Sequence, residues 1–262
     1  MSRIRKGINK SIARYGYRIE KFKKPDFFEL LLHYYLTTTN GELSFIQIGA
    51  NDGVRYDPIF GFVTNPAYRL NGLVIEPVPR FYKALCNNYA KYDGIVALNL
   101  AVHNELKTSK LYAIGEEHEG LVPQSALGMA SFNREHLLRP DVPQNYIKEI
   151  EVPCASLAEI AEKYHLNKFD LLQIDTEGYD AEIILGMDFQ QVKPKLIHFE
   201  HGIRDGIMSM AKFESVISHL NDNGYQVLPE RYDAIAFTLE FFSAHLPKFK
   251  GAIIDRAVGY RP

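Results

Sequence analysis

Short apolar runs alternate with helical patterns along most of the chain. The runs are short, apolar and partly β-branched, which is typical of buried parallel strands. They cover residues 44–49, 72–77, 95–102, 170–175 and 195–201. Residues 26–37 and 79–91 have helical spacing, and Pro79 suits the first turn of the second helix. This alternation predicts an α/β fold with a doubly wound, Rossmann-like sheet and helices on both faces.

The C-terminal part has a different pattern. Residues 224–239 contain two strand-like runs around a short polar turn, which predicts an antiparallel hairpin rather than another βαβ unit. Open α/β sheets bind ligands at the carboxyl ends of their strands. The chemistry should therefore follow the ends of the five predicted parallel strands. These ends are Ile48, Ile75, Leu100, Ile174 and Phe199.

The loop after the first strand reads FIQIGANDG, residues 45–53. Neither GxGxxG nor a phosphate loop ending in GK[ST] occurs there, which argues against a nicotinamide or triphosphate ligand. Its glycines would let the backbone approach a ligand, and Asn51 and Asp52 would supply hydrogen-bonding groups. The alternative is a tight turn that uses these residues only for its geometry. Glu76 ends the second strand, where nucleotide folds place an acid on the ribose, and so favours an adenosine ligand.

Charge is unevenly distributed along the 262 residues. The net charge is -2, but residues 1–24 hold nine Lys and Arg against one acid, which leaves 21 bases against 31 acids in the rest. A body this acidic argues against a nucleic-acid partner. The two cysteines, Cys86 and Cys154, lack a CxxC spacing, and no apolar run reaches the roughly 18 residues of a membrane span. We therefore expect a cytoplasmic protein.

Residues 1–24 also have a helical apolar pattern. Ile4, Ile8 and Ile12 begin a series spaced by three or four residues, which predicts a basic amphipathic helix ahead of a main domain over 25–262. One interpretation is peripheral attachment to the anionic inner face of a membrane. The other is packing on the acidic surface of the main domain.

Four segments together resemble a known family. FIQIGANDG, VIEPVPRFYKAL (74–85), ALNLAV (97–102) and DLLQIDTEGYDAEIILG (170–186) are similar, in order and spacing, to the FkbM-like family of S-adenosylmethionine-dependent methyltransferases. The resemblance extends from about residue 43 to about residue 240. It implies the class I methyltransferase fold, with a seven-stranded mixed sheet whose last strand is antiparallel, and S-adenosyl-L-methionine as cofactor.

The resemblance also implies a cofactor site. Glu76 would bind the ribose, Asn99 would lie near the adenine, and Ser131 would lie in a segment close to the cofactor, as would Asp175. The methionine end would be lined by Gly49, Asn51, Asp52 and Gly53.

Transfer to a hydroxyl also requires removal of a proton. His201, at the end of the fifth strand, is our first choice for the base, because an unperturbed histidine is largely neutral near pH 7. Asp175 is the alternative base, with His201 orienting it. His198 should point to the opposite sheet face and be structural, because strand side chains alternate.

The acidic residues after the fourth and fifth strands suggest a second possibility. Asp175, Glu177 and Glu200 could hold Mg²⁺ through oxygen ligands and lower the pKa of the acceptor hydroxyl. The alternative is that Glu177 and Asp180 stabilise the start of the following helix, where negative side chains are favourable.

A long insertion lies between the third and fourth strands. Residues 103–155 contain several prolines and many polar residues, so a continuous helix is not expected, and such insertions often serve as lids. We expect an O-methyltransferase acting on a hydroxyl of a small molecule or glycan, with a sugar as the leading acceptor. The sugar comes from the family's association with polysaccharide and natural-product pathways. The alternatives are an N-methyltransferase of a small molecule and a non-catalytic adapter that retains the cofactor fold.

Overall fold

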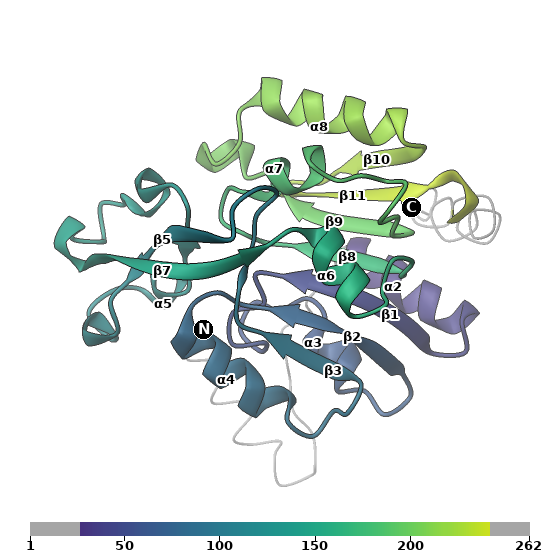
Figure 1. Ribbon diagram of the computed structural model, residues 1–262, viewed down its shortest axis with the longest axis horizontal. Coiled ribbons are helices and arrows are strands. Elements are labelled where there is room, and N and C mark those ends of the chain that lie inside the picture. Colours follow the sequence, from purple (N-terminus) through teal and green to yellow (C-terminus); the bar gives the residue numbers. More distant parts are fainter. Residues whose placement is uncertain (1–26, 242–262) are drawn as a thin grey trace, which may run out of the picture.

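The computed structural model describes residues 27–241, which form a three-layer α/β fold (Figure 1). The predicted basic helix over residues 1–24 lies outside this range, and both of its interpretations stay predictions. Within the described range, no helix is both long enough and apolar enough to cross a bilayer.

The main sheet has seven strands in the order β10-β11-β9-β8-β1-β2-β3. They are β1 (Glu42–Ile48), β2 (Arg69–Ile75), β3 (Ile95–Leu98), β8 (Leu171–Ile174), β9 (Leu196–Glu200), β10 (Tyr225–Pro229) and β11 (Asp233–Thr238). The pairs that join β3, β2, β1, β8 and β9 are parallel, whereas β11 is antiparallel to both of its neighbours. This confirms the predicted mixed sheet and the C-terminal hairpin. The last strand lies inside the sheet, and β10 forms the edge.

Helices cover both faces of this sheet (Figure 1). One face carries α2 (Phe27–Thr38), α3 (Phe60–Val63) and α4 (Pro79–Tyr89), and the other carries α6 (Leu157–Lys163), α7 (Asp180–Leu185) and α8 (Met210–Asp222). Consecutive strand residues serve opposite cores, as the pleat requires. Phe45 of β1 belongs to the cluster that contains Phe28 of α2. Its neighbour Ile46 belongs to the cluster that contains Ile183 of α7.

The apolar run at residues 95–102 is not one strand, contrary to the prediction. β3 ends at Leu98, and the Asn99 side-chain amide donates to the carbonyl oxygens of Glu76 and Pro77 at 2.8 and 3.0 Å. The chain then leaves the main sheet and forms β4 (Ala101–Val102), which pairs with β7 (Ile147–Ala155). The run is apolar on both sides of Asn99 because its two halves belong to two different sheets.

The insertion and the preceding strand β4 build the second sheet, whose order is β4-β7-β5-β6. The other elements of the insertion are β5 (Thr108–Ile114), β6 (Ala130–Ser131), α5 (Gln124–Leu127), η2 (Glu116–His118), η3 (Arg134–Leu137) and η4 (Gln144–Tyr146). One further short helix, η5 (Ile203–Asp205), follows β9 in the main domain. The insertion projects beside the carboxyl ends of the parallel strands (Figure 1) and has its own apolar cluster, which includes Leu111, Leu127 and Val152. The absence of a continuous helix agrees with the sequence, and the lid function stays a prediction.

Candidate active site

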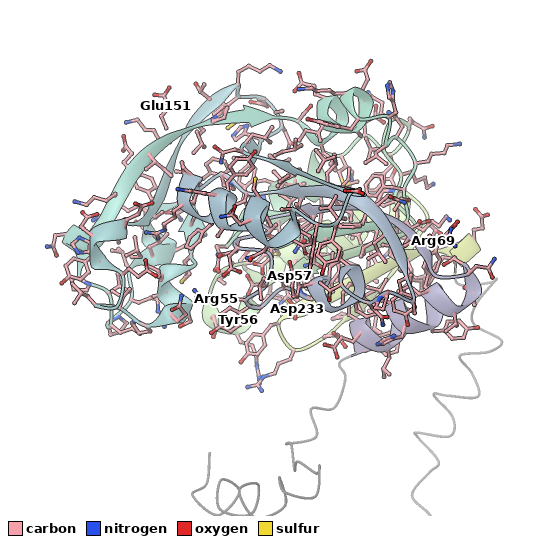
Figure 2. All side chains as sticks on the ribbon, turned by 90° about the horizontal axis from the view of Figure 1, so that it is seen from below. Arg55, Tyr56, Asp57, Arg69, Glu151 and Asp233 are labelled. Atoms are coloured by element: carbon pink, nitrogen blue, oxygen red, sulfur yellow. The ribbon has the colours of Figure 1, made fainter. Side chains whose placement is uncertain are left out.

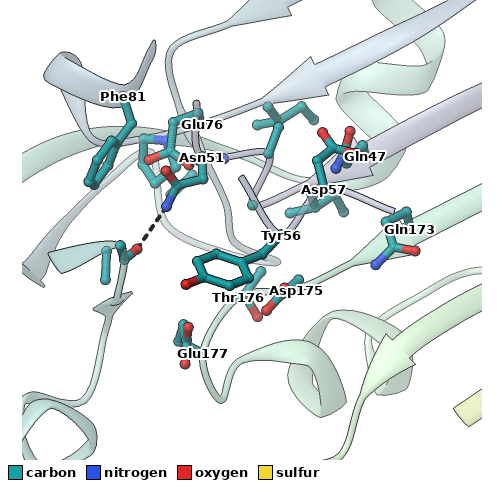
Figure 3. Close-up of a pocket in the computed structure, with 18 of the residues that line it drawn as sticks. Gln47, Asn51, Tyr56, Asp57, Glu76, Phe81, Gln173, Asp175, Thr176 and Glu177 are labelled. Carbon is teal, nitrogen blue, oxygen red and sulfur yellow. Dashed lines mark hydrogen bonds between the residues drawn. The ribbon is translucent and has the colours of Figure 1, made fainter. Parts of the chain in front are cut away.

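A cavity of about 260 Å³ opens at the carboxyl ends of β1, β2 and β8 (Figure 3). The loops after these three strands form its base. The insertion supplies a further wall through Leu111, Gln124, Ala130 and Phe132. The cavity therefore lies where an open α/β sheet is expected to bind its ligand.

Gly49 follows β1 in a position that only glycine can occupy. Its φ is +82°, and a Cβ atom there would lie 1.7 Å from the carbonyl oxygen of Asp175. The amide nitrogens of Gly49 and Ala50 both donate to the carbonyl oxygen of Ile75, at 2.9 and 3.0 Å. The glycine thus brings the ends of β1, β2 and β8 into direct backbone contact, and it lines the cavity.

The other predicted residues of this loop have two different roles. Asn51 lines the cavity, and its side-chain amide donates to the carbonyl oxygen of Gly128 in the insertion at 2.9 Å (Figure 3). The Asp52 carboxylate instead accepts the amide N–H groups of Val54 and Arg55, at 3.0 and 2.8 Å. Asp52 does not line the cavity and shapes the loop.

Gly53 is likewise outside the cavity lining. Its φ is +72°, and an added Cβ would lie 2.4 Å from the Tyr89 ring and 2.5 Å from the Leu85 side chain. It allows the loop to pack against α4. Of the four loop residues predicted to bind the cofactor, Gly49 and Asn51 thus face the cavity.

Glu76 lies in the cavity wall at the end of β2 and is 4% exposed. One carboxylate oxygen accepts the Asn51 amide N–H at 2.9 Å, and the other accepts the Val78 amide N–H at 2.8 Å. Burial raises its pKa to about 7, against these hydrogen bonds, which lower it. Each oxygen keeps a lone pair that could accept a ribose hydroxyl.

The surface beyond Glu76 is apolar. Phe81, Leu100 and Val102 line it. Asn99, predicted to lie near the adenine, does not line the cavity, because its amide binds the two carbonyl groups that end β2. The neighbouring residues of the same segment would therefore contact an adenine ring there.

Ser131 is buried behind the loop that follows β8. Its hydroxyl donates to the carbonyl oxygen of Glu177 at 2.9 Å, and Nδ1 of His136 lies 2.9 Å from the same oxygen. Glu177 has a φ of +54° and Gly178 a φ of +107°. Ser131 thus positions this loop from the insertion and does not itself line the cavity.

The loop after β8 brings two carboxyl groups to the cavity. Asp175 and Glu177 both line it, and no hydrogen bond to the Asp175 carboxyl occurs among residues 27–241. The Asp175 side chain is open to the cavity, while protein surrounds it on its other sides. This desolvation and the charges of Glu177 and Glu200 raise the pKa of Asp175 well above its ordinary value. Desolvation and then the charge of Asp180 raise the pKa of Glu177 to about 7.

Asp180 has a structural role. Its side chain is buried and accepts hydrogen bonds from the hydroxyl and amide of Thr176, and from the amide of Glu200 at 3.0 Å. Burial raises its pKa to about 6, although these hydrogen bonds oppose the shift. Asp180 therefore ties the loop after β8 to the end of β9.

His201 does not reach the cavity. The residue is 4% exposed, its Nε2 lies 3.2 Å from the carbonyl oxygen of Glu230, and its Nδ1 accepts the Ile203 amide N–H at 3.3 Å. Its ring packs 4.7 Å from the Phe213 ring. Because both ring nitrogens are engaged with the backbone, Asp175 replaces His201 as the first candidate for the base.

The expected magnesium ligands do not form a metal site. No group of three or more His, Cys, Asp or Glu side chains in the described part of the chain is arranged to hold a metal ion. Asp175 and Glu177 line the cavity, whereas Glu200 does not. The residues present thus do not fit Mg²⁺, and no step of the mechanism below uses it.

The comparison with family models decides the family. Residues 47–227 match the model described as the methyltransferase FkbM domain, which is well over half of the chain. The chain belongs to the FkbM methyltransferase family. It is an S-adenosylmethionine-dependent methyltransferase, as the resemblance implied. The search of curated proteins found no match.

Solved structures of methyltransferases are more distant. Methanococcus jannaschii fibrillarin, a pre-rRNA processing protein, has 14% identity and a TM-score of 0.39, over 76% of this chain and 67% of that one. Aeropyrum pernix fibrillarin, solved with S-adenosyl-L-methionine, has 12% identity and a TM-score of 0.41, over 75% and 66%. The METTL16 methyltransferase domain has 11% identity and a TM-score of 0.45, over 88% and 77%. The chain spans about two thirds of each fibrillarin.

Several cavity residues were not predicted from the sequence. Gln47 and Gln173 lie within β1 and β8, and Tyr56 and Asp57 lie in the loop after β1. Figure 2 shows Tyr56 beside Arg55 near the edge of the molecule away from Glu151 of β7, with Asp57 further inside. The sequence did contain a signal for the glutamines, because each is the single polar residue in a run of four, FIQI for Gln47 and LLQI for Gln173.

Proposed function

We propose that this methyltransferase is an O-methyltransferase acting on a hydroxyl of a small molecule or glycan, with a sugar as the leading acceptor class. The observation that carries the proposal is the Asp175 carboxyl, which faces the cavity with no hydrogen-bond partner in the described residues and has a raised pKa. A hydroxyl acceptor needs a base at the reacting atom, and a base is most effective with a pKa near the working pH.

The cavity has two ends that suit the two reactants. Phe81 and Val102 with Glu76 would hold the adenosine part of S-adenosylmethionine, and Gly49 lets the backbone approach the methionyl part. When bound, the cofactor supplies a methyl group on a sulfonium, with a neutral thioether as leaving group. The carboxyl groups of Asp175 and Glu177 suit this positive charge, and its presence would lower their raised pKa values.

Asp175 would then act on the acceptor. Its carboxylate would accept the hydroxyl proton as the oxygen attacks the methyl carbon in line with the sulfonium, and Glu177 would remain beside it. The exclusion of water by the insertion wall would strengthen both interactions. Polar side chains elsewhere in the lining, including Gln124 and Ser125, offer hydrogen bonds to a polyhydroxylated acceptor.

The test combines binding with turnover. Asp175→Asn should keep the affinity for S-adenosylhomocysteine within about threefold and lower single-turnover methyl transfer by about 100-fold or more. Asp222→Asn, which changes an exposed carboxyl at the end of α8, is the matched control and should change neither value. Labelled S-adenosylmethionine would be offered with a panel of methyl glycosides and a matched panel of amines.

The alternatives make different predictions in this experiment. An N-methyltransferase would turn over amines only, and Asp175→Asn would scarcely change its rate. A non-catalytic adapter would bind S-adenosylhomocysteine and methylate neither panel. Turnover that is unchanged by EDTA would exclude the magnesium requirement that the sequence left open. Methylation of amines alone, or methylation of neither panel, would overturn the proposal.

A further inference from the structure

Two buried glutamines lie side by side under the cavity. Gln47 of β1 and Gln173 of β8 are direct partners in the sheet, and each residue is 3% exposed. Both point to the face covered by α2, where most of the neighbouring core residues are apolar, and both line the cavity. A buried amide without full hydrogen bonding is costly, so each of its groups needs a partner.

The orientation of Gln173 is fixed by a histidine. Its Oε1 lies 2.6 Å from Nδ1 of His198, whose ring stacks on Phe28 with 4.1 Å between ring centroids. Burial lowers the pKa of His198 to about 3, so the ring is neutral and its Nδ1–H donates to Gln173. The Gln173 amide nitrogen makes one long bond, 3.4 Å to the carbonyl oxygen of Ile174. One of its N–H groups therefore remains open to a ligand.

Gln47 lies beside an acidic side chain of the loop after β1. Its side-chain amide lies beside the Asp57 carboxyl group, which accepts the amide N–H groups of Ile59 and Phe60 at 2.7 and 2.9 Å (Figure 3). The oxygen of the Gln47 amide, Oε1, can only accept hydrogen bonds. This oxygen is buried and has no hydrogen-bond partner among residues 27–241.

We propose that Gln47 and Gln173 form a ligand subsite that takes a hydrogen-bond donor, either a hydroxyl or an ammonium group. Gln47 Oε1 accepts the bond, and the Gln173 N–H can donate to an oxygen beside it. The carboxyl groups of Asp57 and Asp175 line the same part of the cavity and disfavour an anion. Figure 3 shows this part opposite the end that holds Glu76 and Phe81.

The hydrogen-bond donor that occupies this subsite could come from either of two ligands of the enzyme. One is a second hydroxyl of the acceptor, in which case the subsite rests on the proposed function and orients the methylated hydroxyl. The other is the α-ammonium of the cofactor's methionyl group, which does not depend on the nature of the acceptor. Truncation of the ligand separates them, because 5′-methylthioadenosine lacks the amino-acid group of S-adenosylhomocysteine.

The first measurement is calorimetric binding of both nucleosides to wild type and to Gln47→Met. This substitution keeps the side-chain length and removes the acceptor oxygen. If the ammonium occupies the subsite, the affinity for S-adenosylhomocysteine falls about tenfold or more and that for 5′-methylthioadenosine stays within twofold. A general folding defect would weaken both ligands equally. Gln226→Met, on β10 and outside the cavity lining, is the matched control.

The second measurement is the kinetics of the best methyl glycoside from the panel. If an acceptor hydroxyl occupies the subsite, Gln47→Met raises its KM about tenfold and leaves the affinity ratio of the two nucleosides unchanged. If Gln47→Met changes the affinity ratio of the two nucleosides but no glycoside is methylated, the subsite is supported and the proposed sugar acceptor is refuted. If Gln47→Met leaves this affinity ratio unchanged, the subsite is overturned in two cases. One is that the kinetics with the glycoside are also unchanged, and the other is that no glycoside is methylated.

Discussion

Two glycines allow the cost of a steric collision in the active-site backbone to be measured separately from the cost of its left-handed backbone conformation. Gly49 and Gly120 have the same φ, +82°, but a Cβ on Gly120 would have no atom within 4 Å, whereas one on Gly49 would lie 1.7 Å from the Asp175 carbonyl oxygen. Alanine at either position adopts an unfavourable left-handed conformation, which costs about 1 kcal/mol. Gly120→Ala should therefore lower the free energy of unfolding by about 1 kcal/mol.

Gly49→Ala adds a collision that the fold cannot avoid. Ordinary contacts of a Cβ begin near 3.4 Å, so the ends of β1 and β8 would have to separate by more than 1 Å. Such overpacking typically adds about 3 kcal/mol, which gives a total loss of about 4 kcal/mol. The displacement would also move Asp175, so the affinity for S-adenosylhomocysteine should fall by more than tenfold.

The assay is urea unfolding of wild type and both variants, followed by calorimetry with S-adenosylhomocysteine. The slope of the unfolding free energy against urea should be the same in all three proteins, so that the midpoints report stability. Equal stability losses in Gly49→Ala and Gly120→Ala would refute the steric argument. Full cofactor affinity in Gly49→Ala would refute the link between this contact and the site.

Two further predictions concern stability and pH. Burial, followed by the charges of Glu177 and Asp180, raises the pKa of Glu200 from 4.5 to about 8, so native-state stability should fall as the pH rises from 4.5 to 8. Glu200→Gln should raise the urea midpoint at pH 8.5 and hardly change it at pH 4.5; an equal effect at both would contradict this. Burial alone would raise the pKa of Asp170, but hydrogen bonds from Lys195 and other donors lower it below 3.8. The contribution of Asp170 to the free energy of unfolding is therefore present above pH 3.8 and is lost at lower pH. Asp170→Asn should lower the unfolding free energy by about 2 kcal/mol at pH 7, measured by urea unfolding, and a neutral effect would show that this network adds nothing.

The architecture was predictable because its strands are buried on both faces. The apolar runs that form β1, β2, β8 and β9 were recognisable without their partners, and the hairpin of β10 and β11 was recognisable from its turn. The split of residues 95–102 was not, because an apolar run does not reveal which sheet each half joins. The turn depends on the Asn99 amide and the carbonyl groups at the end of β2, more than 20 residues away.

The site was predicted in part for the same reason. Gly49, Asn51, Glu76 and Asp175 lie at strand ends, and strand ends locate the cavity. The position of His201 depends on distant backbone instead. His201 lies just past the end of β9 and before the turn at Gly202, and its imidazole meets the carbonyl group of Glu230 in the loop between β10 and β11. Alternation of side chains along the strand does not describe a residue that lies past the end of the strand.

The pairing of β1 with β8 also affects how the protein reaches its native state. Ser44 and Asp170, at the start of these strands, are hydrogen-bonded although they lie 126 positions apart in the chain, with the whole insertion between them. The entropy of closing so long a loop delays this contact during folding, while β1 and β2 can pair early. The cavity is complete only after β8 joins, so the cofactor can bind only the late, fully paired state. Cofactor supply in the cell would therefore raise the yield of folded enzyme as well as its turnover.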